Sequence, residues 1–194
     1  MKFVLLALML PLTLSAQELR VLSGGAAKSL VDPLAASFRG AKPIARVGIG
    51  VAVNESAPVP DISTVDAFRK TLLAAKSIVY IDPKVGTSGK HVAEVLSKLG
   101  IAEEINKKAR LGQGGYIVEP VGRGEIELGI HQISEILPVK GVKLVGELPK
   151  ELQKYTTYVA VPVTQSRAVL DFIDHLTGPE ARKRLAQAGY AAPE

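Results

Sequence analysis

The stretch "IVYIDPKVGTSGKHVAEVLSKLG", residues 78–100, combines the two patterns that decide the fold. Its first part is a short apolar run that is typical of a buried β-strand. Its last part repeats apolar residues at helical spacing and ends at Gly100, a residue favoured at helix C-termini. Between the two lies the Gly-Thr-Ser-Gly loop of residues 86–89. The stretch therefore predicts a strand, a turn and the start of a helix, in that order.

The same alternation of strand and helix patterns continues along the chain. The expected strands are residues 18–25, 45–53, 76–82, 109–112, 127–134, 142–149 and 155–163. The expected helices are residues 26–38, 64–75, 89–100, 101–109, 114–125 and 166–190, the last joined at Gly178–Pro179. Ser63 is the predicted N-cap of the helix at 64–75, with Asp66 three residues on, as in a capping box. This alternation predicts an α/β fold with a mostly parallel sheet, in which ligands bind at the carboxyl ends of the strands.

The composition limits the function. The chain has 194 residues, of which 47% are hydrophobic and 22% charged, as expected for a folded protein with one core or two small ones. It lacks cysteine, which excludes disulfides and thiolate metal sites, and its three histidines are too scattered to predict a metal site. No cofactor is predicted either. We expect His131 to be a satisfied structural histidine and His175 to be a solvated surface residue.

The charge argues for a small anionic ligand rather than for nucleic acid. The net charge is +5, but the basic residues are spread along the chain, and aromatic residues make up only 5%. Proteins that stack nucleobases interleave basic and aromatic residues, so no nucleic-acid partner is predicted. A basic protein nevertheless attracts anions electrostatically.

The N-terminus has the pattern of a secretory signal. Lys2 precedes the apolar run "FVLLALMLPLTL", and small residues follow it. Residues 1–16 are therefore predicted to be a signal peptide with cleavage after Ala16, which places the mature protein in the periplasm or otherwise outside the cytoplasm. No later stretch of the sequence is apolar for long enough to span a membrane, so the mature chain is not expected to be membrane-spanning.

Two turns between a strand and a helix carry the residues suited to hold an anion. Exposed N–H groups at a helix start bear partial positive charge, hydroxyls add donors, and glycine allows close approach of the backbone. The residues concerned are Ser23, Gly24, Gly25 and Ala26 in the first turn and Thr87, Ser88 and Gly89 in the second. The alternative is that Thr87 or Ser88 is simply an N-cap, which contributes about 1 kcal/mol. Neither turn has the spacing of a nucleotide-binding loop.

The sequence does not predict an enzyme. "HQISE" brings His131, Ser134 and Glu135 together, but a strand would point His131 and Ser134 to opposite sides. The sequence contains no Gly-x-Ser-x-Gly motif and no pair of acidic residues that can be assigned to one cleft. We therefore expect a binding protein.

Four stretches resemble the molybdate-type periplasmic solute-binding proteins of ABC importers. They are "ELRVLSGGAAKSLVDPLAASF", "SIVYIDPKVGTSGKHVAEVLSKLGI", "VGRGEIELGIHQISEILPVKGVKLVGELPKELQKYTTYVAVPV" and "AVLDFIDHLTGPEARKRLAQAGY". The resemblance implies a monomer with the type 2 periplasmic-binding fold, in which two α/β lobes close on a ligand held by hydroxyls and backbone N–H groups. It implies an ABC transporter permease as partner. It also implies that Gln132, which replaces a tyrosine of the family, contacts the ligand.

The resemblance has one large departure. The family has further strand–helix units where this chain passes from Phe38 directly to Ala45, so the first lobe is expected to be reduced. The implied lobes are residues 17–54 with 155–194 for lobe 1 and residues 55–154 for lobe 2. The sequence leaves open whether the chain is a divergent short member or a truncated remnant that no longer binds.

The leading hypothesis is an extracytoplasmic protein that captures a small anion, such as a molybdate-like oxyanion, for an ABC importer. Because Gln132 stands in place of the family tyrosine, the identity of the anion stays open. The alternative is a sensor or interaction domain of the same fold that binds an organic acid or a protein partner.

Overall fold

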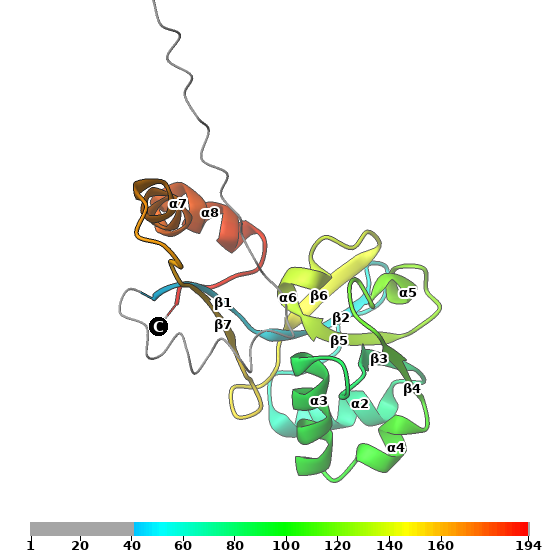
Figure 1. Cartoon of the computed structure of the whole chain (residues 1–194). Helices are drawn as coiled ribbons and strands as arrows, with labels where there is room; N and C mark the ends of the chain where they lie inside the picture. Colours follow the sequence, from blue (N-terminus) through cyan, green and yellow to red (C-terminus); the bar gives the residue numbers. More distant parts are fainter. Residues whose placement is uncertain (1–40, 194) are drawn as a thin grey trace, which may run out of the picture.

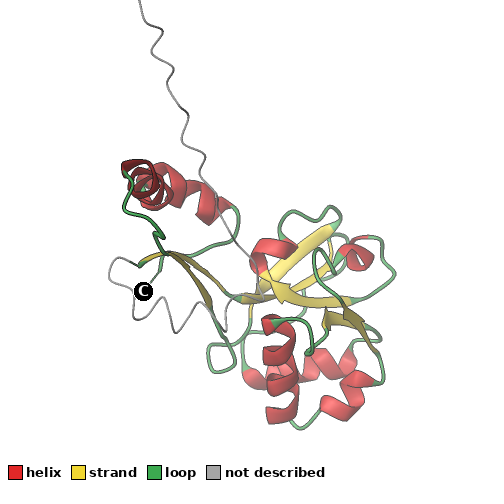
Figure 2. Ribbon diagram, viewed as in Figure 1, coloured by secondary structure: helices red, strands yellow, loops and turns green. Residues whose placement is uncertain are grey.

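The computed structural model describes residues 41–193, which form two β-sheets with helices around them (Figures 1 and 2). The signal peptide predicted at 1–16 and the strand and helix expected at 18–38 lie outside the described residues. Within residues 41–193, no helix is long and apolar enough to cross a membrane.

The larger sheet has five strands in the order β4-β3-β5-β2-β6. Its strands are β2 (Ile49–Asn54), β3 (Ile78–Ile81), β4 (Ala109–Gly112), β5 (Leu128–Gln132) and β6 (Val142–Glu147). Strand β3 is parallel to β4 and β5, whereas β2 is antiparallel to both β5 and β6. Four strands therefore run in one direction and only β2 runs against them, which confirms the predicted α/β class.

Helices cover both faces of this sheet. They are α2 (Val65–Ala74), α3 (Thr87–Lys98), α4 (Ala102–Asn106), α5 (Glu119–Gly122) and α6 (Ile133–Ile136). Alternate side chains of a strand point to opposite faces, so Ile78 and Tyr80 of β3 join the core beneath α2, α3 and α4. Val79 and Ile81 join the second core, beneath α5 and α6. Burial on both sides explains why this strand is a continuous apolar run.

The smaller sheet pairs β1 (Lys42–Val47) with β7 (Thr156–Ala160) in antiparallel register. The helices α7 (Arg167–Thr177) and α8 (Pro179–Gln187) follow β7, and Figure 1 shows this ribbon between them and the five-stranded sheet. The two helices meet at Gly178, as predicted.

The strand expected at 45–53 is divided at Gly48, so β1 and β2 belong to different sheets. A Cβ on Gly48 would lie 2.9 Å from Gln153 Nε2 and 3.0 Å from Tyr155 Cε1, so an added side chain would have to displace these side chains. Gln153 also donates to Ile49 O at 2.9 Å and accepts from Ile49 N at 3.0 Å. The division into lobes at 17–54 with 155–194 and at 55–154 stays a prediction, and β2 lies by its hydrogen bonds in the five-stranded sheet.

One predicted helix cap is correct and the other is displaced by a residue. Gly100 has φ +67° and donates to Ser97 O at 3.0 Å, as expected of a glycine after a helix. The predicted N-cap at Ser63 is wrong, because Thr64 Oγ1 accepts the capping bond of α2. The Ser63 N–H instead donates to the Asp61 carboxylate in an Asx turn, which delays the helix by one residue.

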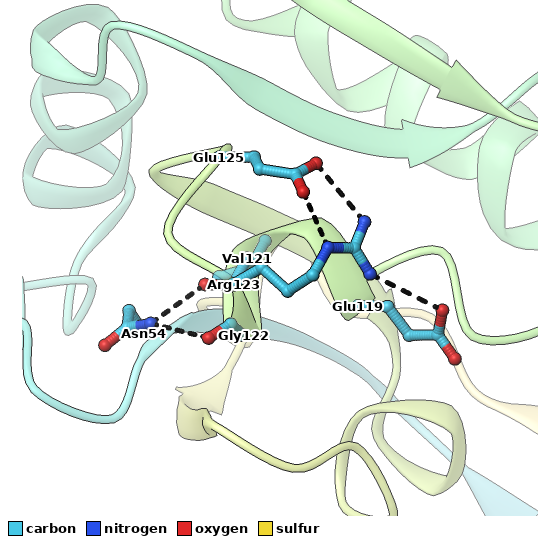
Figure 3. A network of polar contacts seen from close by, with 6 residues as sticks. All are labelled: Asn54, Glu119, Val121, Gly122, Arg123 and Glu125. Atoms are coloured by element: carbon cyan, nitrogen blue, oxygen red, sulfur yellow. Dashed lines mark hydrogen bonds and ion pairs between the residues drawn. The ribbon is translucent and has the colours of Figure 1, made fainter.

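Side-chain hydrogen bonds and ion pairs surround helix α5 at one edge of the sheet (Figure 3). Asn54 Nδ2 donates to Val121 O at 3.1 Å and to Gly122 O at 2.9 Å. Arg123 pairs with Glu125, with an Nε to Oε1 distance of 2.6 Å, and also contacts Glu119. Because Asn54 ends the one reversed strand, this network lies at the amino edge of the four parallel strands.

Candidate functional site

The candidate site lies at the opposite edge, where the parallel strands end. The carboxyl ends of β3, β4 and β5 meet there because these strands are neighbours with the same direction. Helix α3, which follows β3, packs on one face of the sheet, and α6, which follows β5, packs on the other. Adjacent strands whose following helices diverge in this way create a crevice that binds ligands in α/β proteins.

Helix α3 begins at this edge without a side-chain cap. Its N-cap is Gly86, so the alternative that Thr87 or Ser88 is the cap is wrong. The loop folds back on Asp82, whose carbonyl accepts from Val85 N at 3.0 Å and from Gly86 N at 3.2 Å. This turn places the cap one residue before the hydroxyl residues. The first N–H groups of α3 therefore lack intrahelical acceptors and carry the positive end of the helix dipole.

The three predicted residues of the second turn differ in exposure. Thr87 is exposed, whereas Ser88 and Gly89 are buried. Among the described residues, no hydrogen-bond partner is found for the Ser88 hydroxyl. A Cβ on Gly89 would overlap the carbonyl oxygen of Ile81 and lie 2.8 Å from its carbon. Glycine therefore lets the first turn of α3 pack directly on the end of β3.

Gln132 lies at the same edge as the start of α3. It is the last residue of β5, is half-buried, and donates through Nε2 to Thr156 Oγ1 of β7 at 3.3 Å. An amide nitrogen has two hydrogens, so one donor remains. The other predicted site residues, namely Ser23, Gly24, Gly25 and Ala26, lie outside the described residues.

The turn after β4 also lies at this edge, and sequence reasoning missed it. The sequence predicts a helix from residue 114 that Pro120 disturbs and Gly122–Gly124 ends, but Gly114 has φ +131° and Gly115 has φ +67°, and α5 (Glu119–Gly122) begins only at Glu119. The turn lies next to the α3 loop, because Gln113 Nε2 reaches Asp82 Oδ2 at 3.5 Å. Two consecutive glycines after a strand were the available signal, since glycine alone adopts these conformations without strain.

His131 is buried behind this turn. Its side chain is only 2% exposed, and its Nε2 lies 3.1 Å from Gly115 O and contacts a carboxylate oxygen of Glu135. The prediction of a structural histidine is confirmed for Nε2, whereas no hydrogen-bond partner of Nδ1 is found in the described part of the chain. His175 is exposed on α7, as predicted.

The hydroxyl and acidic residues after β5 lie on a helix rather than on a strand with His131. The strand expected to reach Ser134 ends at Gln132, so Ser134 lies on α6 and not on a strand with His131. Burial, followed by the neighbouring Tyr190 and Glu135, raises the pKa of Tyr158 on β7. Within residues 41–193, no group of three or more His, Asp or Glu side chains could hold a metal ion.

Comparison with known proteins agrees with this architecture. The model of the family "Bacterial extracellular solute-binding protein" matches residues 21–191. An aconitate isomerase from Pseudomonas sp is 34% identical over 170 residues, which cover 83% of this chain and 63% of that protein. The molybdate-binding protein ModA of Escherichia coli (strain K12) is 31% identical over 147 residues, covering 72% of this chain and 56% of ModA. The chain thus spans less than two thirds of the length of these relatives.

Solved structures share the fold at low sequence identity. The periplasmic molybdate-binding protein of Azotobacter vinelandii superposes with a TM-score of 0.61 at 15% identity, covering 87% of this chain and 75% of that one. The L-phospholactate-bound form of PEB3, a protein of Campylobacter jejuni, has a TM-score of 0.61 at 17% identity, covering 87% and 76%. These likenesses show the fold alone, and the family match covers nearly the whole chain. The chain belongs to the bacterial extracellular solute-binding protein family.

Proposed function

We propose that this protein captures a small oxyanion at the carboxyl edge of the five-stranded sheet and delivers it to an ABC importer. The observation that carries the proposal is the uncapped start of α3. Since no side chain within residues 41–193 takes its first N–H groups, these groups and the Thr87 and Ser88 hydroxyls remain available to a ligand.

The donors at this edge suit an anion. A buried anion needs many good hydrogen bonds, because removing it from water is costly. The α3 start and the turn at 113–116 offer backbone N–H groups, and Gln132 offers an amide hydrogen. Asp82, the nearest carboxylate of the α3 loop, is already engaged by Lys84 N at 2.8 Å. That bond is made to Oδ1, and Gln113 Nε2 reaches the other oxygen, Oδ2, at 3.5 Å, so both oxygens already have donors.

The relatives support an oxyanion but differ in which one. The names of the relatives include molybdate-binding proteins, a phospholactate-bound protein and an aconitate isomerase. All three ligands present negatively charged oxygens, which accept hydrogen bonds from N–H and O–H donors. The family relation supports delivery to an importer permease by a monomer. A sensor role of the same fold is the alternative, and loss of anion uptake on deletion of the gene would argue against it.

The test is a thermal-shift screen of the protein with molybdate, tungstate, sulfate, phosphate, citrate and trans-aconitate. An anion present at 100 times its Kd should stabilise the native state by about 2.7 kcal/mol and raise Tm. Failure of every anion to raise Tm would refute the proposal.

The anion that binds is then titrated calorimetrically into Ser88→Ala and Ser97→Ala. Ser88→Ala should weaken binding several-fold, about tenfold if the hydroxyl bonds directly to the charged ligand. Ser97, which is exposed in the last turns of the same helix, is the matched control and should change nothing. Equal affinity of Ser88→Ala and wild type would exclude Ser88 from the site.

A second candidate function is interconversion of aconitate isomers. It is favoured by the 34% identity to an aconitate isomerase over 83% of the chain. Incubation of the protein with cis-aconitate and with trans-aconitate, followed by chromatographic separation, tests it. Recovery of each isomer unchanged would leave binding as the function.

A further inference from the structure

His131 is a buried polar side chain immediately next to the candidate site. It lies on β5, where Leu128 and Ile130 face the core beneath α2, α3 and α4. The alternation of the strand turns His131 to the other face, on the side of α5 and α6. Its ring therefore lies beneath the turn at 113–116 and one residue before Gln132.

The ring holds one carbonyl of that turn. Nε2 lies 3.1 Å from Gly115 O and contacts a carboxylate oxygen of Glu135. Both neighbours are acceptors, so this hydrogen-bond network assigns the ring proton to Nε2. Gly115 O also accepts from Ile117 N at 2.8 Å. The single Nε2 hydrogen is shared between this carbonyl and the Glu135 carboxylate, and the carbonyl faces both His131 Nε2 and Ile117 N.

The direction of this carbonyl decides where the next N–H points. The peptide bonds of the described chain are trans, and in a planar trans peptide the C=O and the following N–H point in opposite directions. Because Gly115 O points to the buried His131, the Tyr116 N–H points away from the His131 ring. Tyr116 is 52% exposed, and within the described part of the chain its N–H has no partner. It is therefore a free donor at the carboxyl edge.

The choice of residue also points to a role beyond packing. Among the residues that the structure describes, the buried His131 Nδ1 has no hydrogen-bond partner, and an unpaired buried nitrogen lowers stability, a cost that an apolar side chain would not carry. We propose that His131 is a positioning residue: it holds the turn at 113–116 from behind so that the Tyr116 N–H donates to the bound anion. This inference rests on the proposed anion-binding function.

The experiment compares His131→Leu with His131→Gln by calorimetric titration of molybdate and of trans-aconitate. Leucine removes the donor to Gly115 O, whereas the glutamine amide can still reach that oxygen and donate. We expect His131→Leu to weaken binding about tenfold or more and His131→Gln to stay within about threefold of wild type. Val121→Ala is the matched control: this residue is fully buried on the same side of the sheet, so its truncation should lower Tm and leave affinity unchanged.

The outcomes separate this inference from the function on which it rests. If His131→Gln keeps the affinity of the wild type for the anion and His131→Leu loses it, the result supports the positioning role. Equal affinity in all variants, or equal losses in the leucine and glutamine variants, overturns it while leaving anion binding in place. If the wild type binds none of the anions of the thermal-shift screen, the proposed function fails, and the role of His131 in binding fails with it.

Discussion

Replacing Gly89 by alanine tests how tightly the first turn of α3 is packed against β3. The added Cβ would overlap Ile81 O and lie 2.8 Å from Ile81 C and 2.9 Å from Asp82 C, where ordinary contacts are 3.4–4 Å. All three obstacles are backbone atoms, which cannot rotate away as a side chain can. The start of α3 must therefore retreat by more than about half an ångström.

The energetic outcome is a competition between two effects. Alanine in a helix is favoured over glycine by about 0.5–1 kcal/mol. Overpacking in a filled site costs about 1–3 kcal/mol. Because the obstacles at Gly89 are backbone atoms of Ile81 and Asp82, we expect the cost of an added methyl group there to be at or above the upper end of this range. We expect a net loss of about 2 kcal/mol in the free energy of unfolding, which for a chain of this size lowers Tm by about 4–8 °C.

Urea denaturation measures the stability of Gly89→Ala, and calorimetric titration measures its affinity for the anion found in the thermal-shift screen. Gly100→Ala is the control, because its Cβ meets nothing within 4 Å but its φ of +67° makes alanine unfavourable there. Both variants should lose stability, but only Gly89→Ala should also lose affinity, since only it moves the start of α3. A Gly89→Ala protein as stable as wild type and with unchanged affinity would refute the reasoning.

Two further substitutions test the local structure by urea denaturation. Thr64→Ala should lose about 1 kcal/mol of stability because it removes the N-cap bond of α2, whereas Ser63→Ala should change stability little; the reverse order would restore the predicted cap. Asn54→Ala should lose about 2 kcal/mol, because two carbonyls of α5 lose their donor. Arg123→Ala, which breaks only the exposed ion pairs with Glu119 and Glu125, should cost less, and an equal or larger loss would contradict this assignment.

Local patterns in the sequence were sufficient to predict most of the helices and strands. The apolar run before residue 82 became β3, the helix-spaced residues after it became α3, and Gly100 ended that helix. These features depend on residues a few positions apart, so periodicity and glycine placement determine them. A predicted helix start was wrong where a neighbouring turn used the same residue. The Asx turn of Asp61 takes the Ser63 N–H, and Thr64 rather than Ser63 caps α2.

The candidate site was only partly accessible from the sequence. The turn with Thr87 and Ser88 is predicted because hydroxyls and glycines stand before a helix pattern. The turn at 113–116 is not predicted, because the pattern of "GGYIVEP" favours a helix and the position of the turn at this edge depends on β4 pairing with β3. The role of His131 was equally invisible, since its partner Gly115 lies on a different loop.

The sequence by itself determined the α/β class, the family resemblance and the hydroxyl-rich start of α3, because each is written in residues adjacent along the chain. Only the tertiary structure decided that the chain crosses between two sheets at Gly48, that β2 runs against its neighbours, and that three loops share one edge. These features depend on hydrogen bonds and packing between segments far apart in sequence, such as the pairing of Gly50 with His131. No local pattern specifies such a partner, because it is chosen by the burial of the whole sheet.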